Sequence, residues 1–417
     1  MTTPTGYRVL VVQPTGDKMG HYGLVATKLC QALTRRGHAV TLCTNLIRPE
    51  SYLDEPPAFS TELVGSGRLA FAPFDRAKRR CPPYYYWGYY RNSVVVTSAA
   101  LKLCRRRTFD VVYMTDVEFF VAALLLRVHH SFLPPVVMQV NAANFTFRDY
   151  PGSIVTKSYK VIQREVFRTA LGTQIAACAV LGEWHRERLR TQLRIPVGLP
   201  VAVIPDGGDA PAAPLSQAEA RRTLGIDYAG PVFLFFGMLR RDKGIEYLVR
   251  AAARLRDEEF RLLIAGYPME YAGSQIVEMV RDAGVSDRVI LRLRYADDRQ
   301  VPAYFFAADA LVLPYTREYR GGSGPLMKGA CAHRRPVIAS NVSAMGELVE
   351  RHAIGFVCVP EDPSSLADAM RTFLALPREH RVKMGERAST LTRANSWDVM
   401  ADRFTELFER TIRPSAR

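Results

Sequence analysis

The chain has 417 residues, of which 48% are hydrophobic and 23% charged, the composition of a globular protein. This composition excludes a disordered chain, a collagen and a disulfide-dense mini-protein, and the length predicts two or three domains. The longest apolar stretch, residues 117–126, is shorter than the roughly 20 residues that a bilayer span needs. The seven cysteines form no CxxC pair and the first residues show no signal-peptide pattern, so we expect a cytoplasmic protein with reduced cysteines.

The net charge is +15, from 56 basic and 41 acidic residues. Such an excess favours anionic partners: a nucleotide, a phosphorylated acceptor, an acidic membrane face or a nucleic acid. Charge alone does not choose among them.

The amino-terminal half alternates strand and helix patterns. Residues 7–13 form a short apolar run, residues 23–36 have helical spacing, and residues 39–43 form a second run. This βαβ unit predicts a parallel sheet. Further strands are expected at residues 111–114, 135–140, 176–180 and 201–204. The loop of residues 204–209 and the prolines after it mark a domain boundary.

The same alternation restarts in the second half. Residues 232–236 read as a buried strand and residues 244–256 as a helix. Further strands are expected at residues 261–265, 289–293, 310–312 and 337–339. The pattern predicts two doubly wound α/β domains with a cleft between them and with ligands at the carboxyl ends of the strands.

We place the first, Rossmann-like domain at residues 1–203 and the second at residues 204–392. Residues 393–417 form a helical segment with its large apolar side chains on one face, which we expect to cross back and pack on the first domain. These side chains are Trp397, Met400, Phe404 and Phe408.

Three groups of motifs in the second half indicate the same kind of domain. They are residues 236–244 (Phe-Gly-Met-Leu-Arg-Arg-Asp-Lys-Gly), residues 307–315 (Ala-Ala-Asp-Ala-Leu-Val-Leu-Pro-Tyr), and residues 321–326, 335–340 and 346–349. In this order they resemble the donor-binding domain of retaining GT-B glycosyltransferases of the family 4 type, which use nucleotide-sugars. The resemblance implies a GT-B architecture with an acceptor-binding first domain and a donor-binding second domain.

One position departs from the common family pattern, which has two glutamates eight residues apart. Glu318 matches the first, but Leu326 stands where the second, which usually grips the nucleotide ribose, is expected. The sequence instead resembles the subgroup with a Ser-Gly-x-Leu turn, many of whose members work on exopolysaccharides.

Two cations follow the strand at residues 232–236. Arg240 and Lys243 lie on a strand-to-helix turn, where cationic side chains can converge on one anion, and the resemblance implies that both hold the donor diphosphate. Arg241 is the weaker candidate because we expect it to point to the other side. Solvated loop charges are the alternative interpretation.

The glycine-rich turn after residue 320 is the second donor element. Ser323 and Pro325 have the residue types of a helix start, and Gly324 allows the backbone to approach a ligand. The resemblance adds Leu326 and Arg294 to the donor-binding residues and places Glu318 beside the donor sugar with a catalytic role. A plain surface turn and an exposed loop carboxylate are the alternatives.

In the first domain, Gly20, His21 and Tyr22 follow the first strand, at the position of the family's loop that approaches phosphate and acceptor. The resemblance implies that Gly20 contacts the donor and that His21 and Tyr22 contact the acceptor or sugar. Asn141 follows the strand ending at residue 140, where relatives often have a histidine on the donor sugar. Asp116 could orient an acceptor hydroxyl. Structural roles for Asp116 and Asn141 remain alternatives.

Metal chemistry has no sequence support. The eight histidines form no HExxH motif, and no Asp-x-Asp motif of metal-dependent transferases occurs. We therefore predict no metal site and no cofactor, with a nucleotide-diphosphate-sugar as co-substrate.

Two stretches bear on the acceptor. Basic residues 76–80 precede the aromatic residues 84–90, and residues 183–194 carry four arginines. Tyrosine and tryptophan suit sugar stacking and also membrane interfaces. Solvated basic helices and peripheral docking on an anionic inner membrane face are both open interpretations.

The leading prediction is a metal-independent retaining glycosyltransferase, a hexosyltransferase in polysaccharide, glycoconjugate or natural-product biosynthesis. Its acceptor would be a saccharide, a lipid-linked saccharide or a small molecule. A nucleotide-sugar epimerase on the same fold and a basic nucleic-acid-binding protein are the alternatives. The sequence contains no recognised nucleic-acid-binding motif, so we expect no nucleic-acid partner.

Overall fold

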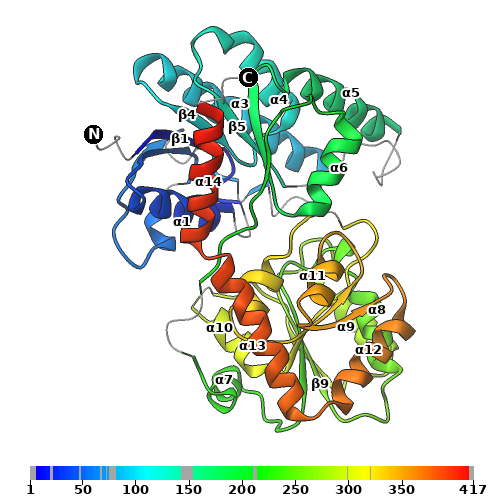
Figure 1. Cartoon of the computed structure of the whole chain (residues 1–417). Coiled ribbons are helices and arrows are strands. Elements are labelled where there is room, and N and C mark those ends of the chain that lie inside the picture. The colour runs from blue at the N-terminus through cyan, green and yellow to red at the C-terminus, as the bar shows by residue number, and fades with distance from the viewer. Residues whose placement is uncertain are drawn as a thin grey trace. The chain divides into compact units, whose positions relative to one another are not determined.

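The computed structural model describes residues 6–18, 22–46, 48–65, 68–71, 73–74, 81–141, 154–209, 214–297, 299–319 and 321–412 (Figure 1). The chain divides into two compact units. The first comprises Met1–Gly207 and Trp397–Arg417, and the second comprises Gly208–Ser396. In the described part of the chain, no helix combines the length and the apolar composition that crossing a bilayer requires.

The described residues of the first unit form a sheet of seven parallel strands in the order β3-β2-β1-β4-β5-β6-β7. Strand β1 pairs with β2 on one side and with β4 on the other, so the strand order reverses between β1 and β4. The strands are β1 (Arg8–Gln13), β2 (Ala39–Thr44), β3 (Ser60–Leu63), β4 (Val111–Met114), β5 (Val136–Val140), β6 (Ile175–Val180) and β7 (Val201–Val203). The pattern analysis had missed β3.

Helices cover both faces of this sheet, because alternate residues of each strand point to opposite faces. Val9 and Val11 of β1 pack in a cluster with Phe404 of α14, whereas Leu10 and Val12 pack in a cluster with α3, α4 and α5. The helices are α1 (Tyr22–Arg35), α3 (Pro82–Arg106), α4 (Phe119–His129), α5 (Ile154–Ala170), α6 (Glu183–Leu193) and α14 (Trp397–Ile412), with short turns η1 (Pro49–Tyr52) and η2 (His130–Phe132).

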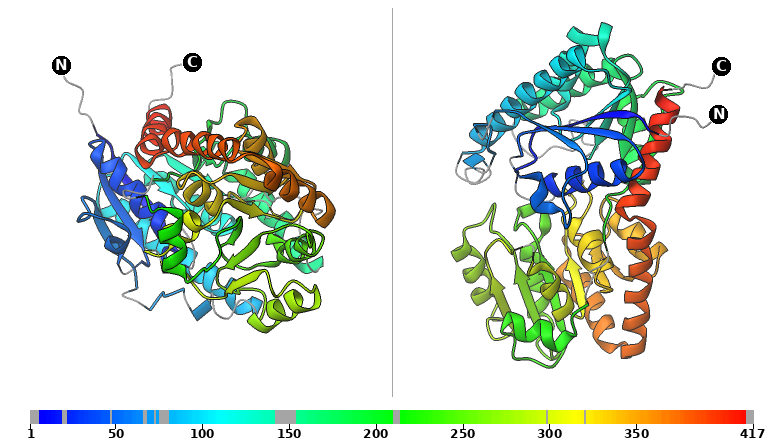
Figure 2. Two further views of the ribbon diagram at one scale, coloured as in Figure 1. Left: turned by 90° about the horizontal axis from the view of Figure 1, so that it is seen from below. Right: turned by 90° about the vertical axis from the view of Figure 1, so that its left-hand side faces the viewer.

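Helix α14 lies beside α1 on the first unit (Figures 1 and 2). Its apolar face is buried, and Phe404 contacts Tyr113 of β4 at a ring-centroid distance of 4.6 Å. Arg36 donates to Asp402 at its edge. The carboxyl-terminal helix therefore completes one layer of the first unit.

The described part of the second unit holds six parallel strands in the order β10-β9-β8-β11-β12-β13, and its strand order reverses between β8 and β11. The strands are β8 (Val232–Phe236), β9 (Arg261–Ala265), β10 (Val289–Arg292), β11 (Ala310–Leu313), β12 (Val337–Ser340) and β13 (Gly355–Cys358). The helices are α7 (Gln217–Leu224), α8 (Ile245–Ala253), α9 (Gly273–Asp282), α10 (Val301–Ala307), α11 (Met345–Arg351), α12 (Pro363–Ala375) and α13 (Arg378–Ala394), with turns η4 (Arg241–Lys243) and η5 (Pro325–Cys331).

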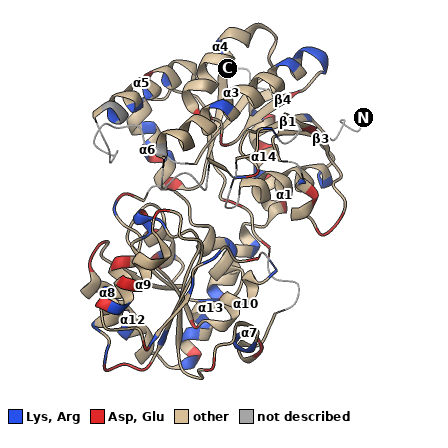
Figure 3. Cartoon of the chain, turned by 180° about the vertical axis from the view of Figure 1, so that it is seen from behind, with Lys and Arg blue, Asp and Glu red and all other residues tan. Residues whose placement is uncertain are grey.

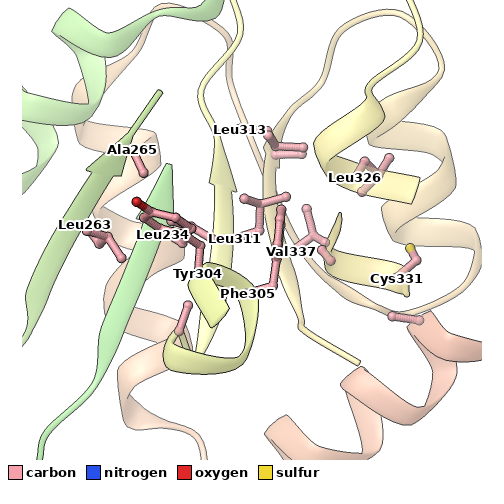
Figure 4. Packing of buried hydrophobic residues seen from close by; sticks show 14 of the residues in the cluster. Leu234, Leu263, Ala265, Tyr304, Phe305, Leu311, Leu313, Leu326, Cys331 and Val337 are labelled. Atoms are coloured by element: carbon pink, nitrogen blue, oxygen red, sulfur yellow. The ribbon is translucent and has the colours of Figure 1, made fainter. Parts of the chain in front are cut away.

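Two apolar layers enclose the second sheet. Leu234, Leu311 and Leu313 point into the layer shown in Figure 4, with Phe305 from α10 and Leu326 from η5. The residues between them on the same strands point into the opposite layer, against α8, α9 and α12. The expected doubly wound α/β architecture is thus confirmed in each unit.

Candidate active site

The carboxyl ends of β8 and β11 form one edge of the second sheet, at the reversal of strand order. Open α/β sheets bind ligands at such points. Gly237 directly follows β8 with φ +120°, a conformation that side chains rarely adopt. Because glycine has no side chain, the backbone at the end of β8 is left accessible to the groups that follow β11.

The turn between β8 and α8 is pressed against the end of β11. Gly244 has φ +65°, and a Cβ atom at this position would lie 2.0 Å from the carbonyl oxygen of Pro314. Thr316 N donates to the carbonyl oxygen of Asp242 at 3.0 Å. This close approach fixes where η4 places its side chains.

Lys243 is the buried cation of this edge, with only 6% of its surface exposed. Its Nζ donates to the Tyr315 hydroxyl at 2.8 Å and lies 4.6 Å from the centre of that ring. The Tyr315 hydroxyl is in turn 3.3 Å from Ser323 Oγ. A chain of polar groups therefore joins η4, the end of β11 and the glycine-rich turn.

Pro325 completes the cluster around Gly237. A Cβ atom on Gly237 would lie 3.4 Å from Pro325 Cγ and 3.8 Å from Lys243 Nζ. Three predicted donor-binding residues, Lys243, Ser323 and Pro325, are thus brought together by the fold. The sequence patterns did not single out Gly237 or Tyr315, although both lie in motif segments that carried the resemblance.

Ser323 also opens the short π-helical turn η5, as the Ser-Gly-Pro pattern predicted. Its Oγ accepts from Leu326 N at 3.3 Å, and Pro325 is the first residue of η5. The side chain of Leu326 is buried among core residues (Figure 4). Any contribution of Leu326 to a ligand would therefore come from its backbone, whose N–H is already bonded to Ser323.

The other two cations of the turn lie differently. Arg240 Nε and Nη2 donate to the two carboxylate oxygens of Asp242 at 3.0 and 2.9 Å, and its guanidinium lies 5.9 Å from the Tyr319 ring. The Arg241 guanidinium lies 5.3 Å from the ring of Tyr271 instead. Arg240 therefore reaches toward the loop after β11, and Arg241 toward the loop after β9.

Glu318 and Arg294 are exposed. Within the described residues, neither side chain makes a hydrogen bond or an ion pair. The fold brings neither of them into the polar chain of Lys243, Tyr315 and Ser323, so their roles at the donor stay predictions.

In the first unit, Asp116 follows β4, where the strand order of that sheet reverses. Gln13 Nε2, at the end of β1, donates to Oδ2 at 2.8 Å, and Asn141 Nδ2, after β5, donates to Oδ1 at 2.9 Å. Burial raises the pKa of Asp116, while the positive charge of Lys18 and the two amide donors oppose this shift. The ends of three neighbouring strands, β1, β4 and β5, thus hold the Asp116 carboxylate in place. The sequence patterns did not predict the contribution of Gln13.

The remaining predictions concern the turn after β1. Gly20 and His21 lie outside the described residues. Tyr22 is the first residue of α1, and its hydroxyl accepts from Lys18 Nζ at 3.3 Å. Across the described chain, no group of three or more His, Cys, Asp and Glu side chains is arranged to hold a metal ion.

Comparison with known proteins identifies relatives of this chain. Residues 216–391 match the family model of glycosyl transferases group 1. D-inositol 3-phosphate glycosyltransferase of Corynebacterium efficiens is 29% identical over 50% of this chain and 50% of its own length. Alpha-D-kanosaminyltransferase of Streptomyces kanamyceticus is 26% identical over 62% of this chain and 66% of its own length. The chain spans about half the length of the first of these relatives.

Solved structures extend the likeness to both units. Sucrose-phosphate synthase of Thermosynechococcus elongatus has a TM-score of 0.75 at 19% identity, covering 98% of this chain and 99% of that one. Anabaena HepE, solved with UDP and glucose, has a TM-score of 0.69 at 16% identity, covering 97% and 99%. The chain shares the fold of GT-B glycosyltransferases, and the family match falls on the unit that carries Lys243.

Proposed function

We propose that this protein is a glycosyltransferase that moves a hexosyl group from a nucleotide-diphosphate-sugar to a hydroxyl acceptor. The observation that carries the proposal is the buried Lys243 ammonium beside the bare backbone of Gly237. This pair lies at the strand reversal of the unit that matches the glycosyl transferases group 1 model. A fixed cation next to a glycine, where no side chain blocks approach, suits a diphosphate, whose oxygens gain negative charge when the glycosidic bond breaks.

In the proposed reaction, the acceptor oxygen forms a bond to the anomeric carbon while the bond from that carbon to the diphosphate oxygen breaks. We place attack on the same face as the leaving group, so the configuration is retained. The acceptor proton passes to the departing diphosphate oxygen. The protein positions the two substrates and stabilises charge, and it supplies no covalent nucleophile.

Lys243 would hold the leaving diphosphate as a point charge, with Tyr315 setting the direction of its ammonium. Arg240 would add a second charge once it exchanges its bond to Asp242 for one to the ligand. Because side chains fill the charge-stabilising role, we propose that no divalent metal is needed. Ser323 is the group that we expect nearest the sugar or the distal phosphate.

Asp116 is the proposed acceptor residue of the first unit. Its carboxylate is held by Gln13 and Asn141, and Oδ1, which accepts only from Asn141, retains a lone pair that can accept a bond from a hydroxyl. A saccharide hydroxyl oriented in this way is directed as a nucleophile. The names of the relatives, an inositol phosphate glycosyltransferase and a kanosaminyltransferase, are compatible with a polyhydroxylated acceptor.

Peripheral binding to an anionic membrane is a further part of the proposal. Three aromatic side chains at the start of α3 are exposed by 43%, 52% and 55%, namely Tyr84, Tyr86 and Trp87, which we call the aromatic patch. Basic residues 76–80 precede it in the sequence, and basic residues are spread over helices of both units (Figure 3). This combination suits an interfacial contact and would give access to a lipid-linked acceptor.

The test of the proposed function is a panel of nucleotide-sugars, read by thermal shift and then by transfer to mixed saccharide acceptors. Because ligand binding stabilises the folded state, the true donor should raise the melting temperature in a concentration-dependent way. Lys243→Met should abolish that shift and Lys102→Met, on the exposed side of α3, should keep it. Turnover of the donor without any acceptor, giving an isomeric nucleotide-sugar, would identify an epimerase instead.

A further inference from the structure

The turn after β1 carries a lysine among aromatic rings. The Lys18 ammonium lies 4.3 Å from the ring centre of Tyr22 and 5.9, 5.6 and 5.6 Å from those of Phe71, Tyr85 and Tyr89. It donates a hydrogen bond to the Tyr22 hydroxyl, at 3.3 Å. Ring faces and hydroxyls attract a cation without neutralising it. The charge of Lys18 is therefore kept and held in place.

The two residues that directly precede Lys18 are held by hydrogen bonds to the rest of the first unit. Gly16 N donates to Asn45 Oδ1 at 2.8 Å, and Phe71 N donates to Asp17 Oδ2 at 2.6 Å. The Asn45 amide also donates to Asp17 Oδ1. A ligand would thus meet an ammonium whose position is set by the residues before it and by the rings around it, which lowers the cost of ordering the Lys18 side chain on binding.

The two carboxylates near Lys18, those of Asp17 and Asp116, already accept hydrogen bonds from neutral groups. Asp17 accepts from an amide and a backbone N–H, and Asp116 accepts from two amides. Among the described residues, no carboxylate forms an ion pair with Lys18. The ammonium therefore retains an unmatched positive charge at the edge where β1 and β4 end.

Lys18 and Asp116 follow the two strands between which the order of the first sheet reverses. They are close enough for the charge of Lys18 to act on the titration of Asp116. A ligand at this edge would therefore meet an acceptor of hydroxyl protons and a fixed cation together. A compact ammonium suits a compact anion.

We infer that Lys18 binds an anionic group, a phosphate or a carboxylate, carried by the acceptor whose hydroxyl Asp116 orients. The inference rests on the proposed function for the role of Asp116 and deepens it by naming the acceptor class. It concerns a binding site that can be measured without any donor.

The experiment measures binding of matched compounds by calorimetry to the full chain: glucose, glucose 6-phosphate and glucuronate, and myo-inositol with its monophosphate. Wild type should bind an anionic member of at least one set more tightly than the neutral parent. Lys18→Met should weaken that anionic member about 10- to 100-fold, the range for a hydrogen bond to a charged group, and leave the neutral parent unchanged. Lys18→Arg should keep most of the preference, and Lys102→Met should keep all of it.

A second measurement uses wild type alone, in case Lys18→Met does not fold. Binding of the preferred anionic member should weaken with added salt, and that of its neutral parent should not. The inference is overturned if wild type never prefers an anionic member, or if Lys18→Met weakens neutral and anionic members equally. Absence of a phosphate-over-carboxylate difference would support a general anion site, and a clear difference would identify which anion it takes. If no nucleotide-sugar of the donor panel binds but the calorimetry shows a preference for the anionic compounds that depends on Lys18, the glycosyltransferase proposal is rejected and the anion-binding site at Lys18 is retained.

Discussion

The ammonium nitrogen of Lys243 lies 2.8 Å from the hydroxyl oxygen of Tyr315, although the two residues are 72 positions apart in the sequence. One follows β8 and the other follows β11, neighbouring strands whose carboxyl ends meet at the strand reversal. The contact holds a buried cation in one direction, next to Gly237. The proposed diphosphate site depends on this relationship.

Removing the Lys243 charge should impair transfer severely. Lys243→Met keeps the volume of the side-chain stem, so we expect a melting temperature near that of wild type. Loss of one preorganised charge-stabilising donor costs on the order of 10²–10³ in rate, and kcat should fall together with donor affinity, because the interaction is strongest in the transition state. Arg240→Ala should also be severely impaired. Arg241→Ala, which removes a charge facing Tyr271, is the control in steady-state kinetics. Equal activity of all three variants would remove the basis for placing the donor at this edge.

Asp116→Asn should weaken use of the acceptor and leave donor binding intact. The variant removes a carboxylate held by Gln13 and Asn141, and the expected loss in kcat/KM for the acceptor is about 10- to 100-fold. The pKa of Asp116 is raised, so wild-type activity should fall as the pH decreases through that raised value, because the carboxylate form is the one that accepts the bond. The acidic limb of the pH profile should be absent in Asp116→Asn. An unchanged pH profile in the variant would assign the limb to another group.

Activity should survive an excess of EDTA. The reason is that Lys243, with Arg240, would fill in the proposed reaction the charge-stabilising role that a divalent cation has in metal-dependent transferases. The measurement is transfer before and after chelation, with magnesium and manganese added back. Complete loss followed by recovery on adding metal would show that the site has been misread.

Anionic vesicles should sediment part of the protein at low salt and less of it at high salt. In the proposed contact, the aromatic patch would insert rings at the interface while basic residues would attract the anionic lipid, and only the second contribution is screened by salt. Trp87→Ser should reduce the sedimented fraction, whereas Val128→Ser, an exposed apolar residue on α4, should not. Full recovery in the supernatant with anionic and neutral vesicles alike would favour a soluble acceptor.

Acid should destabilise the second unit through His333. Burial lowers the pKa of this histidine to about 4, although the hydrogen bond that its Nδ1 donates to the Gly329 carbonyl opposes the shift. Its buried Nε2 has no hydrogen-bond partner among the described residues. Between about pH 6.5 and pH 4 the unfolded chain binds the proton and the folded chain does not, so stability falls as the pH decreases through this range. Urea unfolding of His333→Phe should show a weaker pH dependence there. His352→Gln, an exposed histidine, should behave like wild type.

Local patterns were sufficient for the elements with strong apolar character. The predicted strands at residues 111–114, 232–236 and 261–265 have the bounds of β4, β8 and β9. The two strands that were missed, β3 and β13, are the outermost strands of their sheets. Each is four residues long; β3 is mostly exposed and β13 is mostly half-buried, so neither is fully buried like a central parallel strand.

The sequence by itself determined the α/β class and the types of residue at each strand end, because these depend on local periodicity and turn chemistry. Only the tertiary structure decided which strand ends are neighbours. Lys243 meets Tyr315, and Asp116 meets Gln13 and Asn141, through pairings of strands far apart in the chain. Strand order is set by the burial of whole layers and not by any one segment, so no local pattern could have specified these contacts.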